Sequence, residues 1–214
     1  MGTTRSAIIE KARAKIVQGS DDPFWSYEWW NDKFHQACEL IRKEIVDSEL
    51  NWFMVLGATV TKDANDLYPL PSDCDTVLWV RDSTTNEAIQ PLTPEEENDN
   101  LYYGYKFYNE YLKLLNYDAL PATINIDYYR KIKEIGDWTG ATDTSTDDTY
   151  KQYAPLNTES AARTISDLLV LFADSKDETM TPQQAEMVQT MVSTFVNKLG
   201  TRNKQRPHIL GSDY

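Results

Sequence analysis

Cysteine and histidine are scarce in this chain, and their scarcity restricts the chemistry that it can perform. Two of the 214 residues are cysteine and two are histidine. Cys38 and Cys74 lack the regular spacing of a disulfide framework, so we expect free thiols in a reducing compartment. A catalytic triad would have to use His35 or His208, and a zinc site at His35 and Cys38 would need two further ligands. We therefore expect neither a metal nor any other cofactor.

Long apolar runs and the common catalytic motifs are also absent. No run of about 18 apolar residues occurs, so we expect no membrane-spanning helix, and Met1–Ser6 does not have the pattern of a secretory signal. The sequence has no phosphate-binding glycine motif, no Gly-x-Ser-x-Gly and no His-Glu-x-x-His. Carboxylates are plentiful, and a hydrolase that uses an acidic pair stays open as a second alternative. The favoured prediction is a protein that is not an enzyme.

Positive charge is scarce as well. The chain has 21 Lys and Arg residues against 34 Asp and Glu residues, a net charge of −13. The segment Asn51–Leu156 has 8 basic and 18 acidic residues and so carries −10 of this charge, which leaves the flanking arms nearly neutral. Binding to DNA requires clustered Lys and Arg. If the protein meets DNA, we expect a surface past which DNA moves without binding.

The two ends of the chain have the apolar period of helices. Ser6–Gln18 and Tyr27–Asp47 each place apolar residues at steps of three and four, which predicts two amphipathic helices. Near the C-terminus, Asn157 or Thr158 can cap a third helix and Thr181 can cap a fourth, and a further apolar stripe follows each cap. Gly200 is predicted to end the last helix. We expect these four helices to pack as a bundle.

The middle of the chain has a period close to two and is rich in β-branched and aromatic residues, which predicts strands. The predicted strands are 52–61, 76–81, 101–108, 111–115 and 122–131. Thr93–Glu96 resembles a capping box, so one short helix is expected among the strands. The predicted fold class is therefore α+β, a four-helix bundle with a β-rich insertion and an extended C-terminal tail.

This pattern divides the chain into five segments. They are the N-terminal helices of the bundle at 1–50, the β-rich insertion at 51–135, a flexible loop at 136–156, the C-terminal helices of the bundle at 157–200, and a C-terminal extension at 201–214.

The C-terminal extension is basic, although the chain as a whole is acidic. No acidic residue occurs between Glu186 and Asp213, and apolar residues follow the basic ones. Such a segment is expected to become ordered when it docks on an acidic, grooved partner. The predicted partner-binding residues are Arg202, Lys204, Arg206, Pro207, His208, Ile209, Leu210 and Tyr214.

Aromatic residues permit a further class of function. A stacking platform for sugars would make the chain a carbohydrate-binding or tail-fibre-associated module, which is the first alternative. Aromatics at strand spacing are more often core and interface residues, and we favour the interface interpretation. The residues concerned are Trp25, Trp29, Trp30, Tyr102, Tyr103, Tyr105, Tyr108, Tyr111, Tyr128 and Tyr129.

The order of these features resembles the head-to-tail adaptor, or connector, proteins of tailed bacteriophages. The resemblance covers nearly the whole chain, from the opening helical arm to the two closing helices. It is carried by Ala12-Arg13-Ala14, the Trp-rich second helix, Trp52–Thr61, the turn Tyr68-Pro69-Leu70-Pro71-x-Asp73 before a strand at Val77, and the strand Ile126–Lys131.

The resemblance implies a structural role in the virion. Members form a ring, usually of twelve copies, beneath the portal ring, and the helices surround a channel for DNA. The strand-rich part would face outward or toward the tail or nozzle proteins, and the C-terminal extension would bind the portal. This implies a protein of the portal–tail junction that resides in the host cytoplasm during assembly, without specific DNA binding and without a membrane partner.

Overall fold

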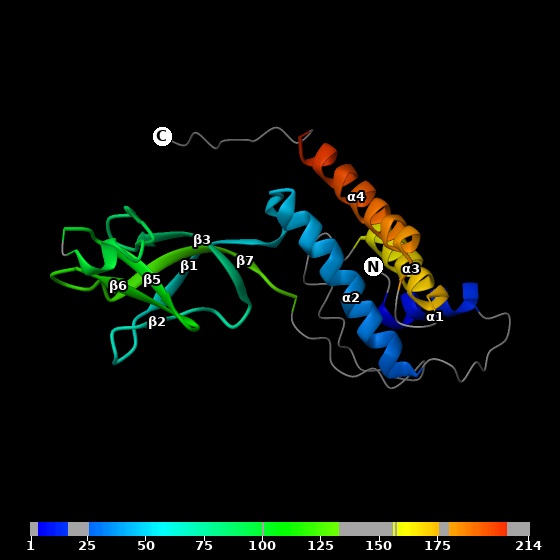
Figure 1. Cartoon of the computed structure of the whole chain (residues 1–214), viewed down its shortest axis with the longest axis horizontal. Coiled ribbons are helices and arrows are strands. Elements are labelled where there is room, and N and C mark those ends of the chain that lie inside the picture. Colours follow the sequence, from blue (N-terminus) through cyan, green and yellow to red (C-terminus); the bar gives the residue numbers. More distant parts are fainter. Residues whose placement is uncertain are drawn as a thin grey trace. The chain divides into compact units, whose positions relative to one another are not determined.

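The structure is a computed structural model that describes residues 4–16, 26–99, 101–132, 156, 158–175 and 180–204. The chain divides into two compact units (Figure 1). Met54–Lys131 forms a strand unit, and the residues before and after it together form a helical unit. The strand unit is therefore inserted into the sequence of the helical unit.

The helical unit is built from both ends of the chain. Its elements are α1 (Arg5–Ile16), α2 (Tyr27–Asp47), the 3₁₀ turn η1 (Asn51–Phe53), α3 (Glu159–Asp174) and α4 (Pro182–Lys204). The apolar stripes predicted from the sequence are buried, as shown by Phe34 and Ile41 on α2 and by Ile165 and Leu169 on α3. None of the described helices is long and apolar enough to cross a membrane.

The predicted four-helix bundle is wrong. In such a bundle every helix lies between two neighbours, but here α3 packs against each of the other three helices, and α1 has extensive contact with α3 alone among the described residues. The physical reason is the short apolar stripe of α1, in which Ile8, Ile9 and Ala12 are buried within 12 residues. That stripe can cover one helix only. The α+β class itself is correct.

Side-chain caps define where the helices begin. The Ser26 hydroxyl accepts a hydrogen bond from Trp29 N at 3.1 Å, and the Thr158 hydroxyl accepts one from Ala161 N at 3.1 Å. At the start of α4, Thr181 and Gln184 form a reciprocal capping box, with Gln184 N 3.2 Å from Thr181 Oγ1 and Thr181 N 2.9 Å from Gln184 Oε1. These caps confirm the helix starts that the sequence predicted.

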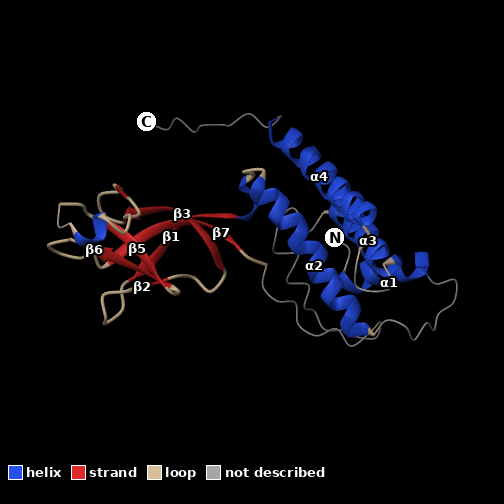
Figure 2. Ribbon diagram, in the orientation of Figure 1, coloured by secondary structure: helices blue, strands red, loops and turns tan. Residues whose placement is uncertain are grey.

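The strand unit contains two antiparallel sheets (Figure 2). Its elements are β1 (Met54–Thr61), β2 (Tyr68–Pro69), β3 (Cys74–Asp82), β4 (Ala88–Ile89), the 3₁₀ turn η2 (Glu96–Asn98), β5 (Gly104–Tyr108), β6 (Tyr111–Leu115) and β7 (Thr123–Arg130). One sheet has the order β1-β7-β3-β4 and the other has the order β2-β6-β5. Asn109 has a φ of 55° and turns the chain between β5 and β6.

A backbone seam joins the two sheets beside β4. Tyr105 N donates to Gln90 O at 2.9 Å, and Leu92 N donates to Tyr105 O at 2.9 Å, so the segment after β4 runs along β5. Gly104 permits this close approach, because a Cβ atom there would lie 2.4 Å from Gln90 O. On the opposite side, β1 contacts β2 directly. The strands therefore enclose one interior.

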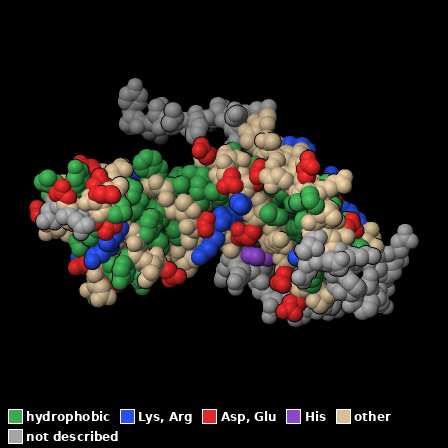
Figure 3. Space-filling view, in the orientation of Figure 1, with side chains coloured by type: hydrophobic (Ala, Val, Ile, Leu, Met, Phe, Trp, Pro, Cys, Tyr) green, Lys and Arg blue, Asp and Glu red, His purple; other side chains and the backbone are tan. Residues whose placement is uncertain are grey.

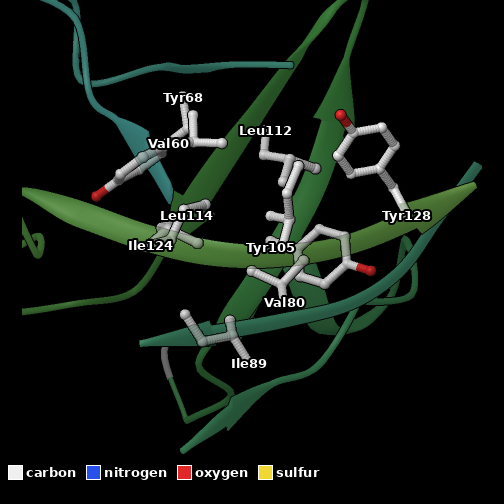
Figure 4. Close-up of a cluster of buried hydrophobic side chains, with 10 residues drawn as sticks. Val60, Tyr68, Val80, Ile89, Tyr105, Leu112, Leu114, Ile124 and Tyr128 are labelled. Carbon is white, nitrogen blue, oxygen red and sulfur yellow. The ribbon is translucent and has the colours of Figure 1, made fainter. Parts of the chain in front are cut away.

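That interior is a single hydrophobic core, shown in Figure 4. All seven strands contribute to it. The buried residues are Val60, Tyr68, Val80, Ile89, Tyr105, Leu112, Leu114, Ile124, Ile126 and Tyr128. Tyr68 is fully buried, and its hydroxyl donates to Pro121 O at 2.5 Å. The strand unit thus has a core independent of the helices.

Several element boundaries differ from those predicted. Gly200 does not end α4, which continues to Lys204, because capping by glycine requires a left-handed backbone that Gly200 does not adopt. β3 begins at Cys74 and β5 begins at Gly104, whereas the predicted strands begin at residues 76 and 101. Of the loop predicted at 136–156, only Leu156 lies within the described residues, and it is buried.

Candidate functional site

Exposed hydrophobic side chains gather on the strand unit. Among the described residues, this unit exposes Leu56, Trp79, Leu101, Tyr102, Tyr103, Phe107 and Tyr108, which we call the apolar surface. Figure 3 shows hydrophobic side chains grouped on this unit with Asp and Glu around them. Leu101, Tyr102 and Tyr103 are consecutive, as are Phe107 and Tyr108, and adjoining exposed hydrophobic side chains indicate contact with another macromolecule.

The charge of this unit narrows the choice of partner. Met54–Lys131 contains 13 Asp and Glu residues against 6 Lys and Arg residues, a net charge of −7. Nucleic acid is repelled by such a surface, because binding to phosphates depends on Lys and Arg. The apolar surface is therefore suited to a protein partner, and positive charge on that partner would favour binding.

A pocket of about 510 Å³ lies in the strand unit. One part of its lining comes from the segment between β2 and β3, including Leu70, Pro71 and Val77. Another part comes from the β5–β6 hairpin, where the Phe107 ring is 54% exposed and lies edge to face with the core residue Tyr105 at 5.7 Å. The pocket therefore continues the hydrophobic core outward to the surface.

Hydrogen bonds hold the walls of the pocket in place. Leu70 N donates to Glu110 O at 2.9 Å, which ties the β2–β3 segment to the hairpin. Lys131 N donates to Asp73 O at 2.8 Å, and the Tyr128 hydroxyl donates to Asp73 Oδ1 at 2.9 Å. Burial and the Asp73 carboxylate raise the pKa of Tyr128. A pocket with fixed walls loses little conformational entropy when it binds a ligand.

The cysteine in the pocket is a poor nucleophile. Burial, and then the carboxylates of Asp73 and Asp75, raise the pKa of Cys74 to about 11. The thiol is therefore protonated near neutral pH, and the thiolate that nucleophilic catalysis needs is scarce. Burial also raises the pKa of Cys38, which is fully buried on α2. Neither thiol fits a catalytic role.

In the four-stranded sheet, the carboxylate of Asp127 on β7 contacts both neighbouring strands, β1 and β3, where their pairing with β7 is irregular. Asp127 is 3% exposed, pairs with the Arg81 guanidinium, and accepts a hydrogen bond from Gly57 N at 2.7 Å. The register of β7 with both β1 and β3 shifts at this level, and Gly57 has a φ of +64°. These bulges hold Leu56 and Trp79 on either side of Asp127.

Two carboxylates of η2 have partners within the strand unit. Glu96 begins η2, and its carboxylate lies 2.9 Å from both the backbone nitrogen and the hydroxyl of Thr93. These hydrogen bonds lower the pKa of Glu96. Glu97 forms an ion pair with Lys106 at 2.5 Å. Within the described residues, no three His, Cys, Asp or Glu side chains are arranged to hold a metal ion.

The predicted partner-binding residues are placed only in part. Arg202 and Lys204 lie in the last turn of α4, and the backbone there is helical. The other six, Arg206, Pro207, His208, Ile209, Leu210 and Tyr214, lie outside the described residues. Their binding to a portal stays a prediction.

The aromatic residues considered as a sugar platform belong to different environments. Trp29 and Trp30 lie in the helical unit, whereas Tyr105, Tyr128 and Tyr129 are buried in the strand unit. Tyr102, Tyr103 and Tyr108 are exposed and belong to the apolar surface. The sequence did not indicate the pocket, because its walls are separated by about thirty residues and no short-range pattern records strand pairing at that distance.

The fold and this site define an α+β protein with an acidic, aromatic surface suited to protein binding. No known protein-family model matches the sequence, and no curated protein gives a significant match.

Proposed function

We propose that the chain is a structural adaptor, or connector, of a tailed bacteriophage virion that joins the portal to the tail around the DNA channel. The apolar surface of the strand unit is the observation that carries this proposal. A surface that combines exposed aromatics with a net charge of −7 favours protein contacts and disfavours DNA binding. Both properties are needed by a ring through which DNA passes.

One face of α4 supports packing between copies. Its exposed residues at helical spacing are all uncharged, namely Gln183, Met187, Thr190, Thr194 and Asn197. Packing of this face against another copy would bury no charge, so the desolvation cost would be small. The face therefore suits side-by-side contact of helical units in a ring.

The order of elements supports the proposal. A helical unit made from both chain ends, with a strand unit inserted after the second helix, is the arrangement that the resemblance implies. In this proposal the partners are the portal ring, the tail or nozzle proteins and other copies of the chain, usually twelve. DNA passes without specific contacts.

Electron microscopy of the protein mixed with candidate portal particles tests this function. We expect an added ring of density on the portal. Thr194→Glu, which places a charge on the uncharged face of α4, should prevent the ring, whereas Gln36→Glu adds the same charge on exposed α2 and should leave it intact. Particles without added density, together with specific binding on a glycan array, would contradict the proposal.

A further inference from the structure

The pocket of the strand unit calls for an occupant with two chemical properties. Its apolar walls, including Leu70, Val77 and Phe107, require a hydrophobic side chain. Its lining also contains the exposed carboxylates of Asp75 and Glu110, with Lys131 as a basic member. In a unit with a net charge of −7, positive charge beside the hydrophobic side chain would be stabilised.

These properties exclude several partners. DNA has the wrong charge for an acidic unit. A second strand unit also has the wrong charge, because each copy carries −7 and the two would repel each other. A basic segment with bulky apolar residues is the chemistry that remains.

The C-terminal segment of the chain has this chemistry. Arg206 is followed by Ile209 and Leu210, and no acidic residue occurs before Asp213. Arg202 and Lys204 precede this segment in the last turn of α4. α4 ends at Lys204, so ten residues follow it and can span up to about 35 Å when extended. Ile209 lies three residues after Arg206, a spacing of roughly 10 Å in an extended chain. This spacing lets an apolar side chain fill a pocket while the guanidinium reaches a rim.

We propose that residues Gln205–Tyr214 of one copy bind in the strand-unit pocket of a second copy. Ile209 and Leu210 contact the apolar wall formed by Val77 and Phe107, and Arg206 pairs with Glu110 at the rim. This inference rests on the proposed function, since it supplies a contact between neighbouring subunits of the ring. It replaces the portal as the partner of this segment.

A peptide-binding measurement tests the contact. The probe is a fluorescent synthetic peptide of residues 201–214, and the receptor is the full chain truncated after Lys204, which leaves the pocket vacant while retaining all of α4. We expect saturable binding by fluorescence anisotropy. Phe107→Ser in the receptor, or Ile209→Ser in the peptide, should weaken binding about tenfold, as expected for loss of a central apolar contact.

Matched variants separate the pocket from general surface effects. Leu101→Ser removes an exposed hydrophobic residue of the same unit outside the pocket lining and should change the affinity less than about twofold. Glu110→Lys should weaken binding several-fold, and Glu87→Lys, the same charge change in the turn between β3 and β4, should have a smaller effect. Circular dichroism verifies that each variant is folded.

Sedimentation of the intact chain tests whether the C-terminal segment binds a second copy. We expect association that increases with concentration and is lost on truncation after Lys204. Absence of saturable peptide binding, or binding unaffected by Phe107→Ser, would overturn the inference, and so would an intact chain that stays monomeric and excludes the peptide. Rings on portal particles without peptide binding would leave the adaptor function standing, whereas peptide binding without such rings would refute the adaptor function alone.

Discussion

Asp127 is a buried carboxylate in an acidic unit, and its two partners explain its position. The Arg81 guanidinium balances its charge, and Gly57 N donates a hydrogen bond at 2.7 Å. Exposed ion pairs contribute little to stability, because water and salt screen them. A carboxylate that is 3% exposed depends on its partners, since water cannot replace them.

Asp127→Asn is expected to destabilise the strand unit by about 1–2 kcal/mol, because the amide keeps a hydrogen-bond acceptor for Gly57 but loses the charge that pairs with Arg81. The expected loss of stability is modest because the Arg81 side chain is 34% exposed and can be hydrated. Urea unfolding measures the change. Arg163→Ala removes an exposed pair with Glu159 and serves as the control, with an expected change below about 0.5 kcal/mol. Equal effects of the two substitutions would contradict this account.

The raised pKa of Tyr68 predicts that the protein loses stability at high pH. Burial, followed by the charges of Asp66 and Asp82, raises its pKa from 10.0 to about 12. Above pH 10 the unfolded chain loses the phenolic proton and the folded chain retains it, so stability falls as the pH rises from 10 to about 12. In Tyr68→Phe this fall should be less steep by up to one proton, as measured by urea unfolding at several pH values. An unchanged slope would show that Tyr68 does not contribute.

Among the elements, α4 shows where local sequence rules apply and where they fail. The capping box at Thr181 and Gln184 begins the helix as predicted, because the donors and acceptors of a cap are close in sequence. The predicted end at Gly200 is wrong, since a glycine stops a helix only when the chain turns into the left-handed region. Whether the backbone turns at a glycine depends on tertiary packing, which the local sequence does not specify.

The effect of Gly200→Ala on stability therefore has an expected direction. Because Gly200 lies inside α4, alanine should stabilise the helical unit by roughly 0.5–1 kcal/mol through its higher helix propensity. The added Cβ would lie 3.8 Å from Leu50 Cδ2, an ordinary contact. Thermal unfolding measures the shift. A lower melting temperature would indicate that the helix ends at this glycine.

Gly104→Ala should have the opposite effect. A Cβ at this position would lie 2.4 Å from Gln90 O and 2.7 Å from Leu92 Cγ, at the seam that joins the two sheets. Because the backbone must move apart there, we expect a loss of about 1–3 kcal/mol in the strand unit. Denaturant unfolding of Gly104→Ala beside Gly200→Ala tests both signs in one background. A neutral Gly104→Ala would show that the seam does not constrain the fold.

At the scale of the whole molecule, the sequence predicted the kinds of element better than their arrangement. Periodicity placed α2 at Tyr27–Asp47 and β6 at Tyr111–Leu115, the bounds that the structure has. Which helices touch was not predictable, because an amphipathic stripe does not specify its partner. The same holds for the pocket, whose walls near Leu70 and Phe107 meet only after the sheets form.

The division into two units has a direct consequence for folding. The strand unit has its own core, and Met54 near its start is paired with Tyr129 near its end, so the chain enters and leaves at neighbouring points. Domains with adjacent ends and an independent core can often be excised without loss of the fold. Among the described residues, every member of this core lies within Met54–Lys131.

We therefore expect Met54–Lys131, expressed alone, to fold as a strand-rich protein with a cooperative unfolding transition. The remaining chain, with Phe53 joined to Ile132 by a short Gly-Ser linker, should keep its helical circular dichroism, because its buried stripes lie on helices from both ends of the chain. Val80→Asp places a charge in the strand core and provides the unfolded reference. If wild-type Met54–Lys131 gives the same poorly dispersed NMR spectrum as Val80→Asp, the strand unit needs the helices to fold, and its core is not sufficient on its own.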